Sequence, residues 1–133
     1  MRIQMNRVNV AMLGTGFIAG FRVQVYRRLQ GVQVVSVLGR DLDRTRKFAE
    51  SNEIASAATT FEEVLKGPDF DAVDLCLPNH LHLEAALQAA RAGKHILCEK
   101  PLGRTAEEAK AMLEAAEAAG VLHCYGENLL FTP

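Results

Sequence analysis

The residue best placed to do chemistry is Lys100, which follows a short apolar run from His95 to Cys98 and precedes Pro101. The run predicts a strand, and the proline predicts its end. Ligands of open parallel sheets bind beyond the carboxyl ends of the strands, so we expect Lys100 to meet a substrate. Its ammonium group can polarise or protonate a substrate oxygen. Glu99 would point to the opposite side of the extended segment.

A glycine-rich turn between Gly14 and Ala19 is the second candidate site. It follows an apolar run and opens a helical pattern, which is the context in which G-x-G-x-x-G/A indicates dinucleotide binding. Gly14 would make the tight turn, and Gly16 would let a pyrophosphate approach the backbone. The alternative is a turn that only reverses the chain. We expect the start of the helix to hold the phosphates, with cofactor contacts at Gly14, Thr15, Gly16, Phe17 and Ile18.

Gly39 and Arg40 stand where the second strand of such a fold ends, about 20 residues beyond the glycine turn. An acidic residue usually reads the ribose 2′-hydroxyl of NAD there. Its absence removes an acceptor for that hydroxyl, and it also removes repulsion against a 2′-phosphate. The forked donors of Arg40 suit a phosphate, so NADP is favoured over NAD. Two alternatives stay open: Arg40 stacks on the adenine, or Asp41 reaches the ribose instead of capping the next helix.

The segment from Leu77 to His82 forms a third candidate site at the end of another predicted strand. Pro78 would end the strand, and Asn79 would cap the following helix, with or without a contact to the cofactor. His82 is expected to face the nicotinamide pocket, whereas His80 should point elsewhere. Histidines two residues apart do not share a helix face, so no metal site is predicted.

Apolar runs and helical periodicity alternate along the chain and define the elements that position these residues. Strands are predicted at residues 8–13, 32–38, 55–58, 72–77, 95–98 and 121–125, and helices at 16–29, 41–51, 61–66, 79–92 and 105–120. Short connections between alternating strands and helices indicate a parallel sheet with helices on both faces. The pattern therefore predicts an α/β fold, a Rossmann-type doubly wound parallel sheet with strand order 3-2-1-4-5-6.

Composition excludes several other classes. The 133 residues fit one domain, and 15 basic against 16 acidic residues leave a net charge of −1. No basic patch for nucleic acid is present, and no apolar run approaches the roughly 20 residues that span a membrane. Cys76, Cys98 and Cys124 match no zinc spacing and suggest no disulfide framework. A cytoplasmic setting is therefore expected.

Three motifs, Gly14-x-Gly16-x-x-Ala19, Pro78-Asn79-x-x-His82 and Glu99-Lys100-Pro101, occur in the order and spacing of one family. The chain resembles the N-terminal domain of the Gfo/Idh/MocA (glucose–fructose oxidoreductase/inositol dehydrogenase) oxidoreductases over essentially its whole length. The resemblance implies NADP or NAD as cofactor, a sugar or polyol substrate, and homo-oligomers. It also implies a catalytic or substrate-positioning role for Lys100, and we expect further cofactor contacts at Gly39, Arg40, Leu77, Pro78, Asn79, His82, Glu99, Lys100 and Pro101.

The family's larger C-terminal substrate domain has no counterpart in this sequence. Residues 1–126 are expected to form the dinucleotide-binding domain, and residues 127–133 to begin the crossover to the second domain. Such a part would bind cofactor but turn over little by itself. We expect the apolar residues near the end to be covered by another domain or to associate: Tyr125, Leu129, Leu130 and Phe131. The alternatives are a non-catalytic dinucleotide-binding sensor or regulatory module and, less in keeping with Glu99-Lys100-Pro101, a methyltransferase.

Overall fold

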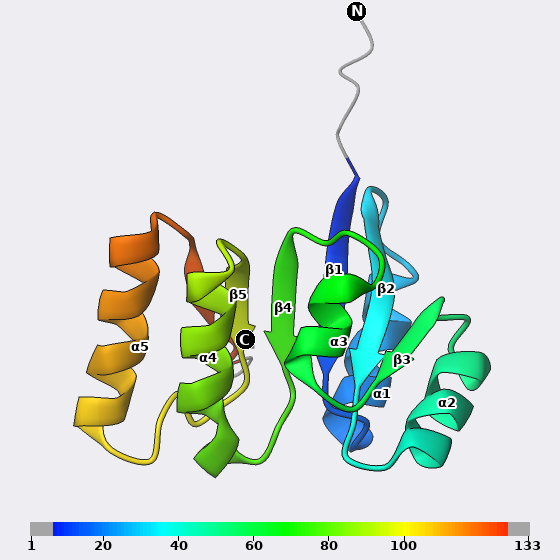
Figure 1. Cartoon of the computed structure of the whole chain (residues 1–133), viewed down its shortest axis with the longest axis horizontal. Helices are drawn as coiled ribbons and strands as arrows, with labels where there is room; N and C mark the ends of the chain where they lie inside the picture. The colour runs from blue at the N-terminus through cyan, green and yellow to red at the C-terminus, as the bar shows by residue number, and fades with distance from the viewer. Residues whose placement is uncertain (1–6, 128–133) are drawn as a thin grey trace, which may run out of the picture.

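One parallel sheet organises the part of the chain that the computed structural model describes, residues 7–127. The strand order is β3-β2-β1-β4-β5-β6, and every neighbouring pair is parallel, which confirms the predicted order. The strands are β1 (Val8–Leu13), β2 (Val32–Leu38), β3 (Ser56–Ala58), β4 (Ala72–Leu75), β5 (His95–Cys98) and β6 (His123–Tyr125). Figure 1 shows the strands side by side, with α3 and α4 in front of them.

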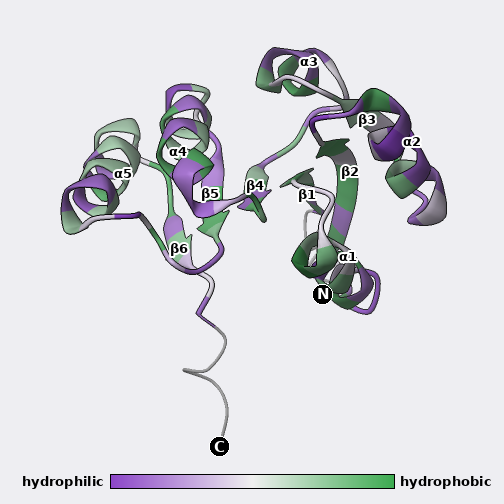
Figure 2. Ribbon diagram, turned by 90° about the horizontal axis from the view of Figure 1, so that it is seen from below, coloured by the Kyte–Doolittle hydropathy of each residue, from purple (hydrophilic) through white to green (hydrophobic). Residues whose placement is uncertain are grey.

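Helices cover the sheet on both faces. They are α1 (Phe17–Tyr26), α2 (Leu42–Ser51), α3 (Phe61–Lys66), the 3-10 turn η1 (Asn79–Leu81), α4 (His82–Arg91) and α5 (Ala106–Ala119). Helices α3, α4 and α5 pack on one face, and α1 and α2 pack on the other, so that two apolar cores form (Figures 1 and 2). None of the helices in the described range is long and apolar enough to cross a bilayer.

Strand β1 shows why the sequence forms a sheet that is buried on both sides. Successive side chains of a strand point to opposite faces. Ala11 and Leu13 accordingly join the core under α3, α4 and α5, whereas Met12 joins the core under α1 and α2. All three are essentially inaccessible to water. A strand with both faces covered needs a continuous apolar run, which is the pattern that predicted it.

Several element ends differ from the predictions. Helix α1 ends at Tyr26, not at residue 29, because the N–H groups of Arg28 and Leu29 bond the carbonyls three residues back and tighten the last turn. Strand β4 stops at Leu75 and β6 starts at His123, two residues inside the predicted bounds in each case. Leu129, Leu130 and Phe131, which were expected to be covered by another domain or to associate, lie outside the described residues.

The predicted cap at Asn79 is wrong. Asn79 begins the 3-10 turn, and neither that turn nor α4 is capped by a side-chain hydrogen bond. A backbone hydrogen bond of 2.9 Å from the N–H of Leu81 to the carbonyl of Pro78 closes this turn instead. By contrast, Asp41 caps α2 as predicted, because its carboxylate accepts a hydrogen bond from the N–H of Arg44 at 2.8 Å.

A buried charge cluster joins α1 to β4 and to the residue after β5. Asp74 on β4 is completely buried, and Arg22 from α1 donates to its Oδ1 at 2.6 Å. The other arm of the same guanidinium donates to Oε2 of Glu99 at 2.5 Å. Tyr26 donates from its hydroxyl to the remaining oxygen of Asp74. Burial raises the pKa of the Asp74 carboxyl, and the nearby guanidinium opposes that rise.

We predict that replacing Arg22 with methionine lowers the free energy of unfolding by about 3–5 kcal/mol, because Asp74 is then left charged and unpaired in the interior. Urea denaturation measures the loss. The matched control is Arg27→Met, which removes an exposed ion pair to Glu53 at the end of the same helix. That control should cost no more than about 1 kcal/mol. Equal losses in the two variants would contradict the assignment of Arg22 as the internal counterion.

Candidate functional site

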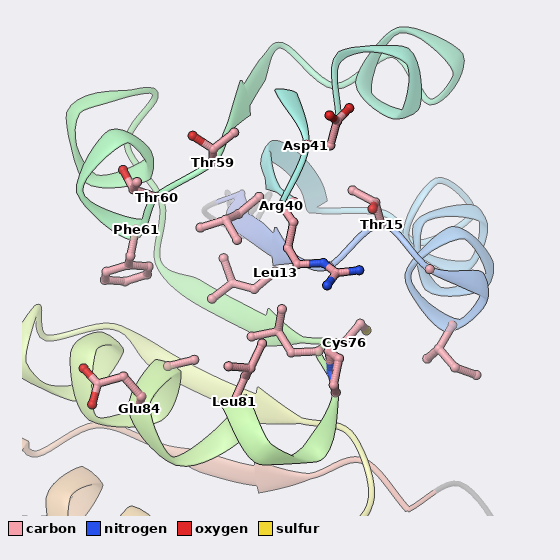
Figure 3. A pocket seen from close by; sticks show the side chains of 18 of the residues that line it. Leu13, Thr15, Arg40, Asp41, Thr59, Thr60, Phe61, Cys76, Leu81 and Glu84 are labelled. Carbon is pink, nitrogen blue, oxygen red and sulfur yellow. The ribbon is translucent and has the colours of Figure 1, made fainter. Parts of the chain in front are cut away.

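A cavity of about 940 Å³ opens at the carboxyl ends of β1, β2 and β4. Its volume lies at the upper end of the range for small-molecule sites. Four segments form its walls: the glycine turn, the end of β2, the loop after β3, and the turn between β4 and α4 (Figure 3). This is the crevice where ligands of doubly wound sheets bind.

Gly14 and Gly16 have different structural requirements. Gly14 has a φ of +124°, and a Cβ there would lie 2.3 Å from the carbonyl oxygen of Cys76, so no other residue fits. Gly16 has ordinary extended backbone, and a Cβ there would meet nothing within 4 Å. Gly14 is therefore required by the fold, whereas the absence of a side chain at Gly16 leaves open space in the cavity wall.

The first turn of α1 presents unsatisfied backbone donors to this space. Gly16 is the N-cap residue, no side chain caps the helix, and the first turn holds no acidic residue. The first N–H groups of a helix lack internal partners and carry the positive end of the helix dipole. Thr15, Phe17 and Ile18 line the cavity beside them. These features fit the pyrophosphate of a dinucleotide, which needs donors and positive potential without a competing carboxylate.

Arg40, Asp41 and Arg44 line the cavity where β2 ends and α2 begins. In Figure 3 the Arg40 guanidinium extends into the space between Thr15 and Cys76, whereas Asp41 lies away from it, at the start of α2. The Asp41 carboxylate accepts the N–H of Arg44. This part of the cavity therefore combines two arginines with one carboxylate that is engaged in a helix cap.

His82 is a buried link between two loops and does not line the cavity, which corrects its expected orientation toward the pocket. Its Nε2 lies 2.8 Å from the carbonyl oxygen of Leu77, and its Nδ1 lies 2.9 Å from that of Pro101. Leu77 belongs to the cavity wall. The imidazole therefore holds the segment after Lys100 against that wall, and the Lys100–Pro101 peptide bond is cis.

The remaining predicted residues divide into two groups. Leu77 and Pro78 line the cavity, together with His80, which was expected to point elsewhere. The 3-10 turn, which replaces the expected start of the helix, changes the direction of the side chains in this segment. Asn79, Glu99, Lys100 and Pro101 are absent from the lining: Glu99 faces Arg22, and Lys100 is exposed at the carboxyl edge of β5.

Sequence reasoning missed the wall formed after β3. Thr59, Thr60 and Phe61 contribute to it, and Glu84 and Gln88 extend it along α4. Parallel strands bring their carboxyl ends to one edge, so the residues following the third predicted strand were a usable signal. The helix residues carried no comparable signal.

Neither Cys76, which lines the cavity, nor Cys98, which is buried at the end of β5, is an activated nucleophile. Burial raises the pKa of the Cys76 thiol, and burial raises the pKa of Cys98 to about 12. Reactive cysteines need the thiolate and therefore a lowered pKa. Within residues 7–127, moreover, no three histidine, cysteine, aspartate or glutamate side chains are grouped to hold a metal ion.

Comparison with known proteins agrees with this geometry. Residues 8–127 match the oxidoreductase family with an NAD-binding Rossmann fold, GFO_IDH_MocA. The chain is 45% identical over 95 residues to 1,5-anhydro-D-fructose reductase of Ensifer adhaerens, covering 71% of this chain and 28% of that protein. It is 32% identical to scyllo-inositol 2-dehydrogenase (NADP(+)) of Bacillus subtilis, covering 95% of this chain and 38% of that enzyme.

A solved structure shows the same fold. The NAD binding oxidoreductase from Klebsiella pneumoniae superimposes with a TM-score of 0.89 at 31% identity, over 96% of this chain and 36% of that one. The chain thus covers between 28% and 38% of the length of these relatives. Family match, fold and glycine turn agree, and the chain belongs to the Gfo/Idh/MocA family of NAD(P)-dependent oxidoreductases.

Proposed function

We propose that the cavity binds NADP(H) and that the chain is the cofactor-binding part of an oxidoreductase acting on a sugar or polyol. The observation that carries this is the uncapped start of α1 facing the same cavity as Arg40 and Arg44. The relatives named above are a reductase of an anhydro-sugar and a dehydrogenase of an inositol, which supports the substrate class.

The charges at the end of β2 support NADP over NAD. No carboxylate stands at position 39, and that of Asp41 already accepts a backbone N–H. An acceptor dedicated to the ribose 2′-hydroxyl is therefore lacking at this point. Arg40 and Arg44 supply donors and positive charge suited to a 2′-phosphate. NAD remains the alternative cofactor, in which case Arg40 would stack on the adenine.

Lys100 is the proposed catalytic residue. The bound cofactor would supply or accept the hydride at a carbinol or carbonyl carbon. Lys100 would donate a proton to the substrate oxygen during reduction and take it back during oxidation, so that no free alkoxide accumulates. Its neighbours fix the backbone on both sides: Glu99 is paired with Arg22, and the Pro101 carbonyl is bound to His82.

The whole protein is proposed to have two domains. The matched relatives are more than twice as long as this chain, and residues 127–133 would lead into a second domain that supplies the other substrate contacts. We infer a homo-oligomer in the cytoplasm, with this chain inactive alone. A dinucleotide-binding sensor would share the cavity but would have no use for Lys100, which separates the two readings experimentally.

Titration with NADPH and NADH, followed by nicotinamide fluorescence, tests the cofactor. We expect NADPH to bind at least ten times more tightly, because a phosphate–arginine pair contributes charge-assisted hydrogen bonds. Arg40→Ala should remove most of that preference and leave NADH binding nearly unchanged. Arg28→Ala, which alters an exposed arginine outside the cavity lining, is the control. A preference for NADH would overturn the choice of NADP.

The two glycines give a second prediction. Gly16→Ala should leave the unfolding temperature unchanged, because the added Cβ meets nothing, and should weaken binding of either dinucleotide because it occupies the approach to the backbone. Gly14→Ala should lower the unfolding temperature and abolish binding as well, because its Cβ collides with the Cys76 carbonyl. Thermal unfolding and fluorescence titration of each variant separate the two effects. Unchanged binding in Gly16→Ala would place the dinucleotide elsewhere.

Lys100→Met should leave NADPH affinity unchanged and lower turnover by roughly 10²–10⁴-fold, the usual contribution of a general acid. The measurement uses the whole protein, with reduction of 1,5-anhydro-D-fructose and oxidation of scyllo-inositol followed by absorbance at the nicotinamide band. Lys110→Met, on the exposed side of α5, is the control. Full turnover by Lys100→Met would remove Lys100 from the reaction.

A further inference from the structure

The backbone at Gly39 is enclosed by two threonines. A Cβ added there would lie 2.4 Å from Oγ1 of Thr45 and 2.9 Å from Cγ2 of Thr15. Carbon atoms do not approach other heavy atoms so closely, so any side chain at this position requires both threonine side chains to move. Gly39 has no left-handed φ, and its need for glycine is therefore one of space and not of conformation.

Thr45 is the neighbour that has no freedom to move. Its side chain is completely buried near the start of α2. The hydroxyl donates to the carbonyl of Asp41 at 2.6 Å, and the backbone N–H of Thr45 bonds the same carbonyl at 2.9 Å. A β-branched side chain in a helix has few allowed χ1 values. Thr15, by contrast, is only partly buried at the cavity wall.

The strand end does not have freedom to retreat either. The N–H of Gly39 donates to the carbonyl of Ala58 on β3, and the N–H of Gly14 donates to the carbonyl of Leu38 on the other side. Displacing Gly39 away from Thr45 would break hydrogen bonds between buried strands, each of which is costly to leave unmade. Of the two threonines beside position 39, Thr45 makes the closer contact and is the less able to move.

From this packing we infer that Thr45 is a specificity-determining residue: it excludes an acidic side chain from position 39 and so commits the cavity to the phosphorylated dinucleotide. The inference rests on the proposed binding of NADP(H) at this site. Thr45 need not contact the cofactor. Its side chain leaves no space for a carboxylate at position 39, at the end of β2. Arg40 and Arg44 are then the charged groups at this point, beside the cap at Asp41.

Three variants and the wild type test this: Gly39→Asp, Thr45→Ala, and both together. Each is assayed for unfolding temperature and for dissociation constants of NADPH and NADH. Gly39→Asp alone should unfold at a lower temperature and bind both dinucleotides poorly. Thr45→Ala alone should keep the preference for NADPH. The double variant should regain most of the lost unfolding temperature and shift the NADH-to-NADPH affinity ratio by at least tenfold toward NADH.

Gly39→Asp combined with Thr45→Val is the matched control. Valine keeps an atom where the hydroxyl lies but cannot make its hydrogen bond, so this pair should behave like Gly39→Asp alone. The inference is overturned if Gly39→Asp folds normally and prefers NADH without any change at Thr45, or if the Thr45→Ala pair regains neither stability nor binding. A wild type that prefers NADH would overturn the cofactor proposal. Recovery of the unfolding temperature of Gly39→Asp by Thr45→Ala and not by Thr45→Val would still establish that Thr45 limits the space at position 39.

Discussion

The arrangement of the central elements depends on one arginine that pairs with two carboxylates, one fully buried and one partly buried. Arg22 lies on the helix that begins at the glycine turn, Asp74 on the central strand β4, and Glu99 directly before Lys100. The guanidinium thus links α1, the helix proposed to bind the phosphates, to the segment that carries the proposed acid. A buried ion pair is not by itself a source of great stability, but loss of one partner leaves an uncompensated charge. Such a cluster tolerates few relative positions of its three elements.

The site follows from the placement of this framework at one edge of the sheet. Gly14 lets β1 turn against the carbonyl of Cys76, and the uncapped start of α1 then faces the cavity. The end of β2 is held between the glycine turn and the first residues of α2, where Thr45 fills the space beside Gly39. The proposed binding and choice of cofactor would therefore rest on backbone geometry and on packing around glycines as much as on charged side chains.

The fold was predictable because its signals are local. Apolar runs, a glycine turn after the first strand and alternating helices specify a doubly wound sheet, and the predicted order of strands is confirmed. Contacts between residues that are distant in the sequence could not be predicted from local patterns. Arg22 and Asp74 are 52 positions apart, and neither their spacing nor their residue types indicated that they would pair. His82 lies in the first turn of a helix as predicted, but it is buried between two loops. A sequence motif does not show the course of those loops. The prediction that Asn79 caps the helix failed because a backbone hydrogen bond closes the turn instead.

The link made by His82 has a consequence for how such a domain can diversify. The two ring nitrogens lie within 3 Å of the Leu77 and Pro101 carbonyl oxygens, and both of these residues belong to the domain itself. The position of Lys100 relative to the proposed cofactor crevice is thus fixed by contacts within the described residues. A change in the surface that contacts the substrate would leave this link in place, because His82 and both of its partners lie within the described residues. A domain built in this way can keep the same cofactor crevice and the same lysine in proteins that act on different substrates.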